Sequence, residues 1–175
     1  AVFSLILSSG CRRNGPVYHM REDIDFSYFK KVAVMPLDNL TNDRSAGDIM
    51  RYLIISELLA SGLVDVAMPG DAITAMSELD VKSAASLNTS QILALGKALN
   101  VEGLIFGTVQ QYGEIRAGNT SAPEVAITLM MADAGSGNIV WSITKSRGGA
   151  DFMARHFGAR SETISETAQA LTREM

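Results

Sequence analysis

The order in which apolar patterns follow one another is the feature that most constrains the fold of this chain. Residues 32–35 form an unbroken apolar run that ends at Pro36, as is typical of a buried central strand. From residue 45 to residue 61, apolar side chains recur at spacings of three and four, which predicts a helix that Gly62 terminates. A second short strand follows at residues 64–68. Because a helix separates these two strands, they require a crossover connection and parallel pairing.

The second half of the chain shows a different pattern, with three strands in succession. Residues 103–109 predict a third strand. Residues 125–131 predict a fourth, with alternating apolar side chains on one buried face, namely Val125, Ile127, Leu129 and Met131. A Gly-rich reversal at residues 133–138 leads into a fifth strand, whose expected common face consists of Ile139, Trp141 and Ile143. Successive strands joined by short turns predict an antiparallel meander.

Further helices complete the pattern. Residues 71–79 and 90–100 predict two helices before the third strand, the second of them capped by Ser90, and a last helix is expected from Ser161 onward. The element order β-α-β-α-α-β-β-β-α predicts an α/β (α+β) fold, with a single mixed β-sheet and helices on its faces. We expect this domain to span residues 31–175.

The orientation of the first helix is also predicted. Ser45 is expected to cap it, with Asp48 as its partner three residues later. The apolar spacing places Ile49 on the buried side and leaves Arg51 and Tyr52 largely on the solvent side.

The N-terminal residues predict a lipid anchor. Residues 1–10 are apolar and end in the small residues Ser9 and Gly10, directly before Cys11, the single cysteine of the chain. This pattern is typical of the end of a bacterial lipoprotein signal that begins upstream of the given sequence, and it predicts cleavage before Cys11 and acylation of its thiol. The run is too short to span a membrane, which takes ~20 residues. The alternative is an ordinary apolar N-terminus with a chance buried cysteine.

The residues after Cys11 predict where the protein works. Arg12 follows the cysteine, and under the sorting rule for enterobacterial lipoproteins this implies the outer membrane rather than the inner one. Residues 11–30 are polar and carry mixed charges, so we expect them to form a tether between the lipid and the domain. The expected location is the periplasmic side of the outer membrane.

Composition and motifs argue against several classes of function. The net charge is −4 and no run of Lys or Arg exceeds two residues, so nucleic acid is not an expected partner. His19 and His156 have no spaced ligand partners, so no metal site is predicted. Gly103 and Gly107 bracket a strand instead of opening a helix, so no phosphate loop and no cofactor is expected. Without a nucleophile motif or a titratable cluster, the chain is not expected to be an enzyme.

Three segments in order resemble a family of envelope lipoproteins. They are residues 31–42 (KVAVMPLDNLTN), 98–109 (ALNVEGLIFGTV) and 135–142 (GSGNIVWS). Together they are similar to the CsgG-type curli secretion channels and the LpoB-type activators of penicillin-binding proteins, which share a domain similar to the N-terminal domain of TolB. The resemblance covers roughly residues 30–146. It implies an α/β domain that acts through protein contacts and without catalytic residues.

The resemblance implies a function with two alternatives. The first expectation is a non-enzymatic lipoprotein that binds other envelope proteins as an accessory or assembly factor of envelope or secretion machinery. The first alternative is an activator of a peptidoglycan synthase. The second is a ring-forming homo-oligomer that resembles the periplasmic part of a curli-type channel.

Two polar loops at strand ends, residues 37–44 and 112–123, are the expected partner-contact surfaces. Their candidate contact residues are Asp38, Asn39, Asn42, Asp43, Glu114, Arg116 and Asn119. In the alternative interpretation these are ordinary connections, in which Asp38, Asn39 and Asn42 hydrogen-bond the backbone of their own turn.

Overall fold

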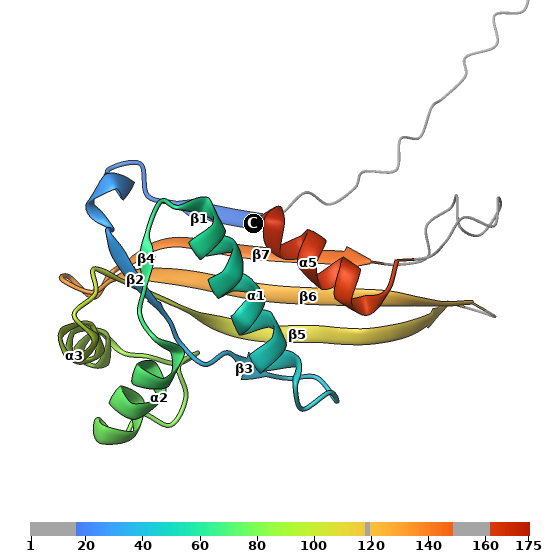
Figure 1. Ribbon diagram of the computed structural model, residues 1–175, viewed down its shortest axis with the longest axis horizontal. Coiled ribbons are helices and arrows are strands. Elements are labelled where there is room, and N and C mark those ends of the chain that lie inside the picture. Colours follow the sequence, from blue (N-terminus) through green and yellow to red (C-terminus); the bar gives the residue numbers. More distant parts are fainter. Residues whose placement is uncertain (1–16, 118–119, 149–161) are drawn as a thin grey trace, which may run out of the picture.

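The computed structural model describes residues 17–117, 120–148 and 162–175. Within them, seven strands form one mixed sheet in the order β1-β7-β6-β5-β2-β4, and β3 pairs with β5 beside this path. Four helices pack on the sheet, as Figure 1 shows. The predicted fold class, the single mixed sheet and the predicted element order are confirmed.

The parallel half of the sheet is built around β2 (Lys31–Val34), the buried apolar run. It pairs in parallel with β5 (Gly103–Ala117) on one side and β4 (Asp65–Val66) on the other. Helix α1 (Ala46–Ser61) makes the crossover from β2 to β4, as the order of patterns requires. Beyond Pro36, the chain pairs with β5 again as the short strand β3 (Asp38–Asn39).

The antiparallel half is a meander of long strands. β5 turns into β6 (Thr120–Asp133), and β6 turns into β7 (Ile139–Gly148). The close approach of β5 and β6 depends on Gly107, since a Cβ there would lie 2.0 Å from the carbonyl oxygen of Thr128. The alternation predicted for β6 is confirmed, because the four predicted side chains are all buried in one cluster.

The loop predicted at residues 112–123 is wrong, because these residues extend β5 and β6 into a hairpin paired as far as Ala117 and Thr120. Gly113 and Pro123 are residues that ordinarily interrupt strands, and they made this stretch resemble a loop. Pro123 lies just beyond the last described β6–β7 pair, Glu124 with Gly148, and it keeps its place opposite Glu114 in the pairing with β5.

The segment predicted as a tether also contains regular structure. Residues Val17–Met20 form β1, which pairs antiparallel with β7 at the edge of the sheet. A short 3-10 helix, η1 (Phe26–Tyr28), follows, and the Asp25 side chain accepts a hydrogen bond from the backbone N–H of Ser27 at its start. The ordered domain therefore begins before residue 31, and Cys11 lies outside the described residues.

Two apolar cores lie on opposite faces of the sheet. On one face, α1 and α5 (Ile164–Arg173) cross the long strands side by side (Figure 1). On the other face, α2 (Pro69–Glu78) and α3 (Thr89–Leu99) cover β2 and the start of β5. A β-bulge between β6 and β7 corrects one prediction, since Ile139 packs in the second core while Trp141 and Ile143 pack in the first.

The helix starts differ from the predicted caps. The Ser45 side chain makes no capping hydrogen bond in α1, and Asp43 instead accepts a hydrogen bond from the Ser45 N–H. In α3, the cap is Asn88 and not Ser90, and it forms a reciprocal capping box with Gln91.

Helix α1 is also rotated relative to the prediction. Arg51 is only 2% exposed, and Ile49 is 38% exposed. The Arg51 guanidinium donates to the carbonyl oxygen of Val34 from Nε at 3.0 Å and from Nη2 at 2.8 Å, and Nη2 also donates to the Pro69 carbonyl at 3.0 Å. Arg51 therefore ties α1 to the end of β2 and to the start of α2.

Candidate interaction surfaces

The described residues offer little for small-molecule chemistry. They contain no group of three or more His, Cys, Asp or Glu side chains that could hold a metal ion. His19 lies on the exposed strand β1, and His156 lies outside the described residues. None of the helices in this part of the chain is long and apolar enough to cross a membrane.

The first predicted contact loop is held by its own hydrogen bonds. Asn39 donates from Nδ2 to the Asp43 carbonyl oxygen at 2.7 Å and accepts from the Thr41 N–H at 2.9 Å. Asp38 accepts a 2.7 Å hydrogen bond from the Ser83 hydroxyl instead of bonding its own turn. Asn42 is exposed. Of the three residues in the turn-stabilising interpretation, Asn39 is thus seen to bond the backbone of its own turn, and partner contact by this loop stays a prediction.

The structure brings this loop against the base of the β5–β6 hairpin. The Leu40 N–H donates to the Val109 carbonyl oxygen at 3.0 Å. Burial, with a smaller effect from the charge of Asp43, raises the pKa of Tyr112 on the same stretch of β5. Glu114 and Arg116 are exposed further along this strand, whereas Asn119 lies outside the described residues.

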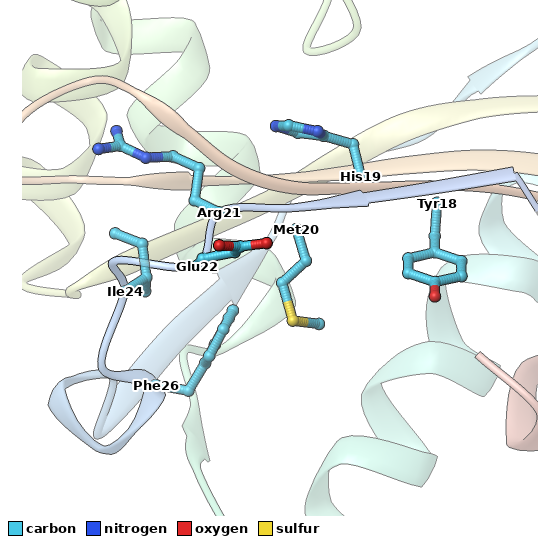
Figure 2. A pocket seen from close by; sticks show the side chains of 7 residues that line it. All are labelled: Tyr18, His19, Met20, Arg21, Glu22, Ile24 and Phe26. Atoms are coloured by element: carbon cyan, nitrogen blue, oxygen red, sulfur yellow. The ribbon is translucent and has the colours of Figure 1, made fainter.

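A recess lies under β1, in a segment whose sequence predicts a tether. It has a volume of about 510 Å³ and lies along residues 18–26. Figure 2 shows Tyr18, Met20 and Phe26 on one side of the strand, with His19 pointing to the other side. Residues 17–20 contain large apolar side chains, but a run of four residues without strict alternation is too short to predict a strand.

A second apolar surface lies on the outer side of α1. Tyr52 and Leu59 are each 56% exposed, and Leu63, just after the Gly62 cap, is 81% exposed. Tyr52 and Leu59 are seven residues apart and so lie on the same side of the helix, two turns from each other. The apolar spacing of the helix correctly predicts Tyr52 on the solvent side, but it does not indicate an apolar surface there.

The last helix is fastened to the sheet by charged side chains. Arg147 of β7 forms an ion pair with Glu162 at 2.7 Å and a second with Glu174. Lys145 contacts Glu174 twice, through its carboxylate at 2.9 Å and its backbone carbonyl oxygen at 2.8 Å. The hydrogen bond from Arg147 lowers the pKa of Glu162, and that from Lys145 lowers the pKa of Glu174.

Comparison with known proteins gives structural matches only. No protein-family model matches the chain, and no curated protein matches it by sequence. Among solved structures, the PelC dodecamer from Paraburkholderia phytofirmans matches with a TM-score of 0.62 and 21% sequence identity. The match covers 91% of this chain and 94% of PelC.

Lipoproteins are among the other matches. Lipoprotein GNA1162 from Neisseria meningitidis matches with a TM-score of 0.55 and 18% identity, over 69% of this chain and 83% of that one. The C-terminal domain of LpoB from Salmonella enterica has a TM-score of 0.49 and 14% identity, over 67% of this chain and 82% of that one. The curli-channel and TolB parts of the predicted resemblance stay expectations. The chain thus shares the fold of PelC and of the lipoprotein GNA1162, as the resemblance to envelope lipoproteins predicted at the level of fold.

Proposed function

We propose that this protein is a non-enzymatic lipoprotein of the bacterial envelope that assembles into a ring of identical copies and binds other envelope proteins. Its lipid would be attached at Cys11, and its place would be the periplasmic side of the outer membrane. In this role it would serve as an accessory or assembly factor of envelope or secretion machinery.

The observation that carries the proposal is the end-to-end match to a protein solved as a dodecamer. The shared fold runs through nearly the whole of both chains, so a domain of this architecture is compatible with assembly into a dodecamer. The exposed apolar side chains of β1 and α1 add support, because large exposed apolar patches in soluble domains mark interaction sites.

The test is the composition and mass of the complex in its native membrane. The full-length lipidated protein would be crosslinked in the envelope and purified, its partners would be identified by mass spectrometry, and its mass would be measured in detergent. We expect higher-order species of the protein itself, together with a secretion or outer-membrane component. A cell-wall synthase as the main partner would favour the activator alternative, and a monomer at every concentration would refute the ring.

Matched variants test the role of the lipid anchor and the role of the contact loops independently. Cys11→Ala is expected to release the protein from the membrane after signal removal, and continued membrane attachment would refute the anchor. Asn42→Arg and Glu114→Arg are expected to lower the yield of crosslinked partner without changing attachment. Glu78→Arg, an exposed change on α2, is the control. An unchanged yield of crosslinked partner in both loop variants would show that the partner does not bind through these residues.

A further inference from the structure

A group of exposed apolar side chains follows the predicted lipid anchor closely along the chain. Val17, Tyr18 and Met20 are 75%, 71% and 55% exposed, although they belong to a paired strand. Phe26 and Tyr28, in the 3-10 helix that comes next, are 37% and 56% exposed. Figure 2 shows Tyr18, Met20 and Phe26 on one side of β1, and we call these three side chains the β1 apolar edge.

The short chain between the anchor and β1 limits how the domain can stand on a membrane. The six residue steps from Cys11 to Val17 span at most about 22 Å when fully extended. The opposite edge of the sheet, β4, lies five strand spacings from β1, roughly 24 Å. An acylated Cys11 in the bilayer therefore excludes a domain that stands on its β4 edge, since Val17 would then be out of reach. The anchor holds β1 on the side of the domain next to the membrane.

The chemistry of this segment suits the interfacial zone of a bilayer but not an anionic surface. Tyrosine and other large apolar side chains are typical of the level of the lipid headgroups. Arg21 is the single Lys or Arg in residues 17–28, and it forms an ion pair with Asp23 at 2.5 Å. Glu22 and Asp25 give the segment a negative net charge, so any attraction to a membrane must come from its apolar side chains.

We propose that the β1 apolar edge inserts into the interfacial zone of the same bilayer that holds Cys11, so that the domain stands on this edge. The inference rests on the lipid anchor of the proposed function and not on the ring. The lipid provides attachment, and the apolar edge fixes the orientation of the domain. Insertion of this kind reaches about 5–10 Å into the boundary between headgroups and acyl chains. The β4 edge then faces away from the membrane.

Fluorescence quenching by labelled lipid tests this contact in the full lipidated chain, reconstituted in phosphatidylcholine vesicles. Because acylation occupies the Cys11 thiol, a cysteine introduced elsewhere is the single free thiol and takes the fluorophore. Phe26→Cys places the label at the proposed contact. Ile73→Cys is the matched control, because Ile73 is 55% exposed on α2 over the other face of the sheet. Doxyl groups near the headgroup end of the acyl chains should quench the label at position 26 at least about twofold more than at position 73.

A further pair of variants distinguishes insertion from mere closeness to the anchor. Tyr18→Glu/Met20→Glu is added to the chain labelled at position 26. Both positions are more than half exposed, so the fold is expected to tolerate the changes, as circular dichroism would verify. Quenching should fall to the level of the Ile73→Cys control while the protein stays in the vesicles, because carboxylates are costly to move out of water. Ile73→Glu, added to the same labelled chain, should leave the quenching unchanged.

Each contrary result identifies what fails. Equal quenching at positions 26 and 73, or quenching that the two glutamates do not reduce, would overturn the insertion and leave the anchor standing. Quenching that appears only when phosphatidylglycerol is added to the vesicles would overturn the apolar contact, since attraction to anionic headgroups would then be its cause. A protein whose Cys11 carries no lipid by mass spectrometry would remove the anchor and, with it, this inference.

Discussion

At the scale of single residues, Arg51 decides how α1 meets the sheet. A buried guanidinium is costly unless its donors are satisfied, and here they reach two backbone carbonyl groups at the ends of neighbouring elements. Burial lowers the pKa of Arg51, but a guanidinium keeps its charge at any physiological pH. Val34 lies on the side of β2 where the short strand β4 has ended, so the side chain of Arg51 replaces a missing strand neighbour.

Removing this guanidinium is expected to destabilise the fold. Arg51→Met keeps much of the side-chain volume but leaves the Val34 and Pro69 carbonyl groups without these donors, so the free energy of unfolding should fall by about 1.5–3 kcal/mol. Urea unfolding followed by circular dichroism measures the change. The exposed Arg44→Met is the control and should stay within about 0.5 kcal/mol of the wild type. Equal effects in the two variants would show that the buried contacts add nothing.

The sequence could not predict the burial of Arg51, because α1 is apolar around much of its circumference. Its buried positions come in adjacent pairs four residues apart: Ala46 with Gly47, Met50 with Arg51, and Ile54 with Ile55. The apolar spacing fits equally well an arc centred on Ile49 and Leu53. Which arc is buried depends on where β2 ends and α2 begins, and this is a tertiary property.

At the scale of elements, α5 shows how a short helix is held on a sheet. Its core contribution is small, since only Ala168 and Leu171 are fully buried apolar side chains. Charged side chains of β7 therefore supplement the packing through Glu162 before the helix and Glu174 after it. Both carboxylates are nearly half exposed, so each pair is worth little alone, and the cluster acts as a network.

This network predicts a loss of stability in acid. The pKa values of Glu162 and Glu174 are lowered in the folded state, so their contribution is present above the ordinary glutamate pKa of about 4.3 and is lost as pH falls through the lowered values. The double variant Glu162→Gln/Glu174→Gln should therefore show a flatter fall in melting temperature below about pH 4.5. Glu78→Gln serves as the comparison. If melting temperature falls with pH in parallel for the double variant and the wild type, this network is not the acid-sensitive element.

Strand prediction succeeded where one face is buried and failed at the sheet margins. The alternation from Val125 to Met131 is strict because one face of β6 packs under two helices, and this pattern is readable in sequence. β1 has only four residues, all exposed, so its pattern carries no burial signal. The far end of the β5–β6 hairpin contains Gly113 and Pro123, and pairing between strands outweighs their local preferences.

At the scale of the whole molecule, the sequence predicts which side chains are apolar but not which of them the fold leaves uncovered. Tyr18 and Tyr52 are both apolar side chains in regular elements, yet each remains more than half exposed after folding. Only the arrangement of the sheet shows that they lie near opposite margins. In the candidate contact loop at residues 37–44, the turn after β3 was predictable because its residue types are typical of turns, but the strand pairing of Asp38 and Asn39 was not. The exposed apolar surfaces likewise required the assembled fold.

The apolar character of the exposed surfaces on β1 and α1 makes the salt dependence of the proposed ring distinctive. Each copy carries a net charge of −4, so copies repel one another, and the exposed apolar side chains of β1 and α1 carry no charge that would attract another copy. Raising NaCl from about 0.05 M to about 0.5 M screens that repulsion and leaves apolar burial nearly unchanged, so association should stay as tight or tighten. Sedimentation velocity of the lipidated protein in detergent measures this. The matched control is wild type in the same salts with urea added, which should weaken an apolar contact. Dissociation by salt alone would mean that ion pairs, and therefore other surfaces, join the copies.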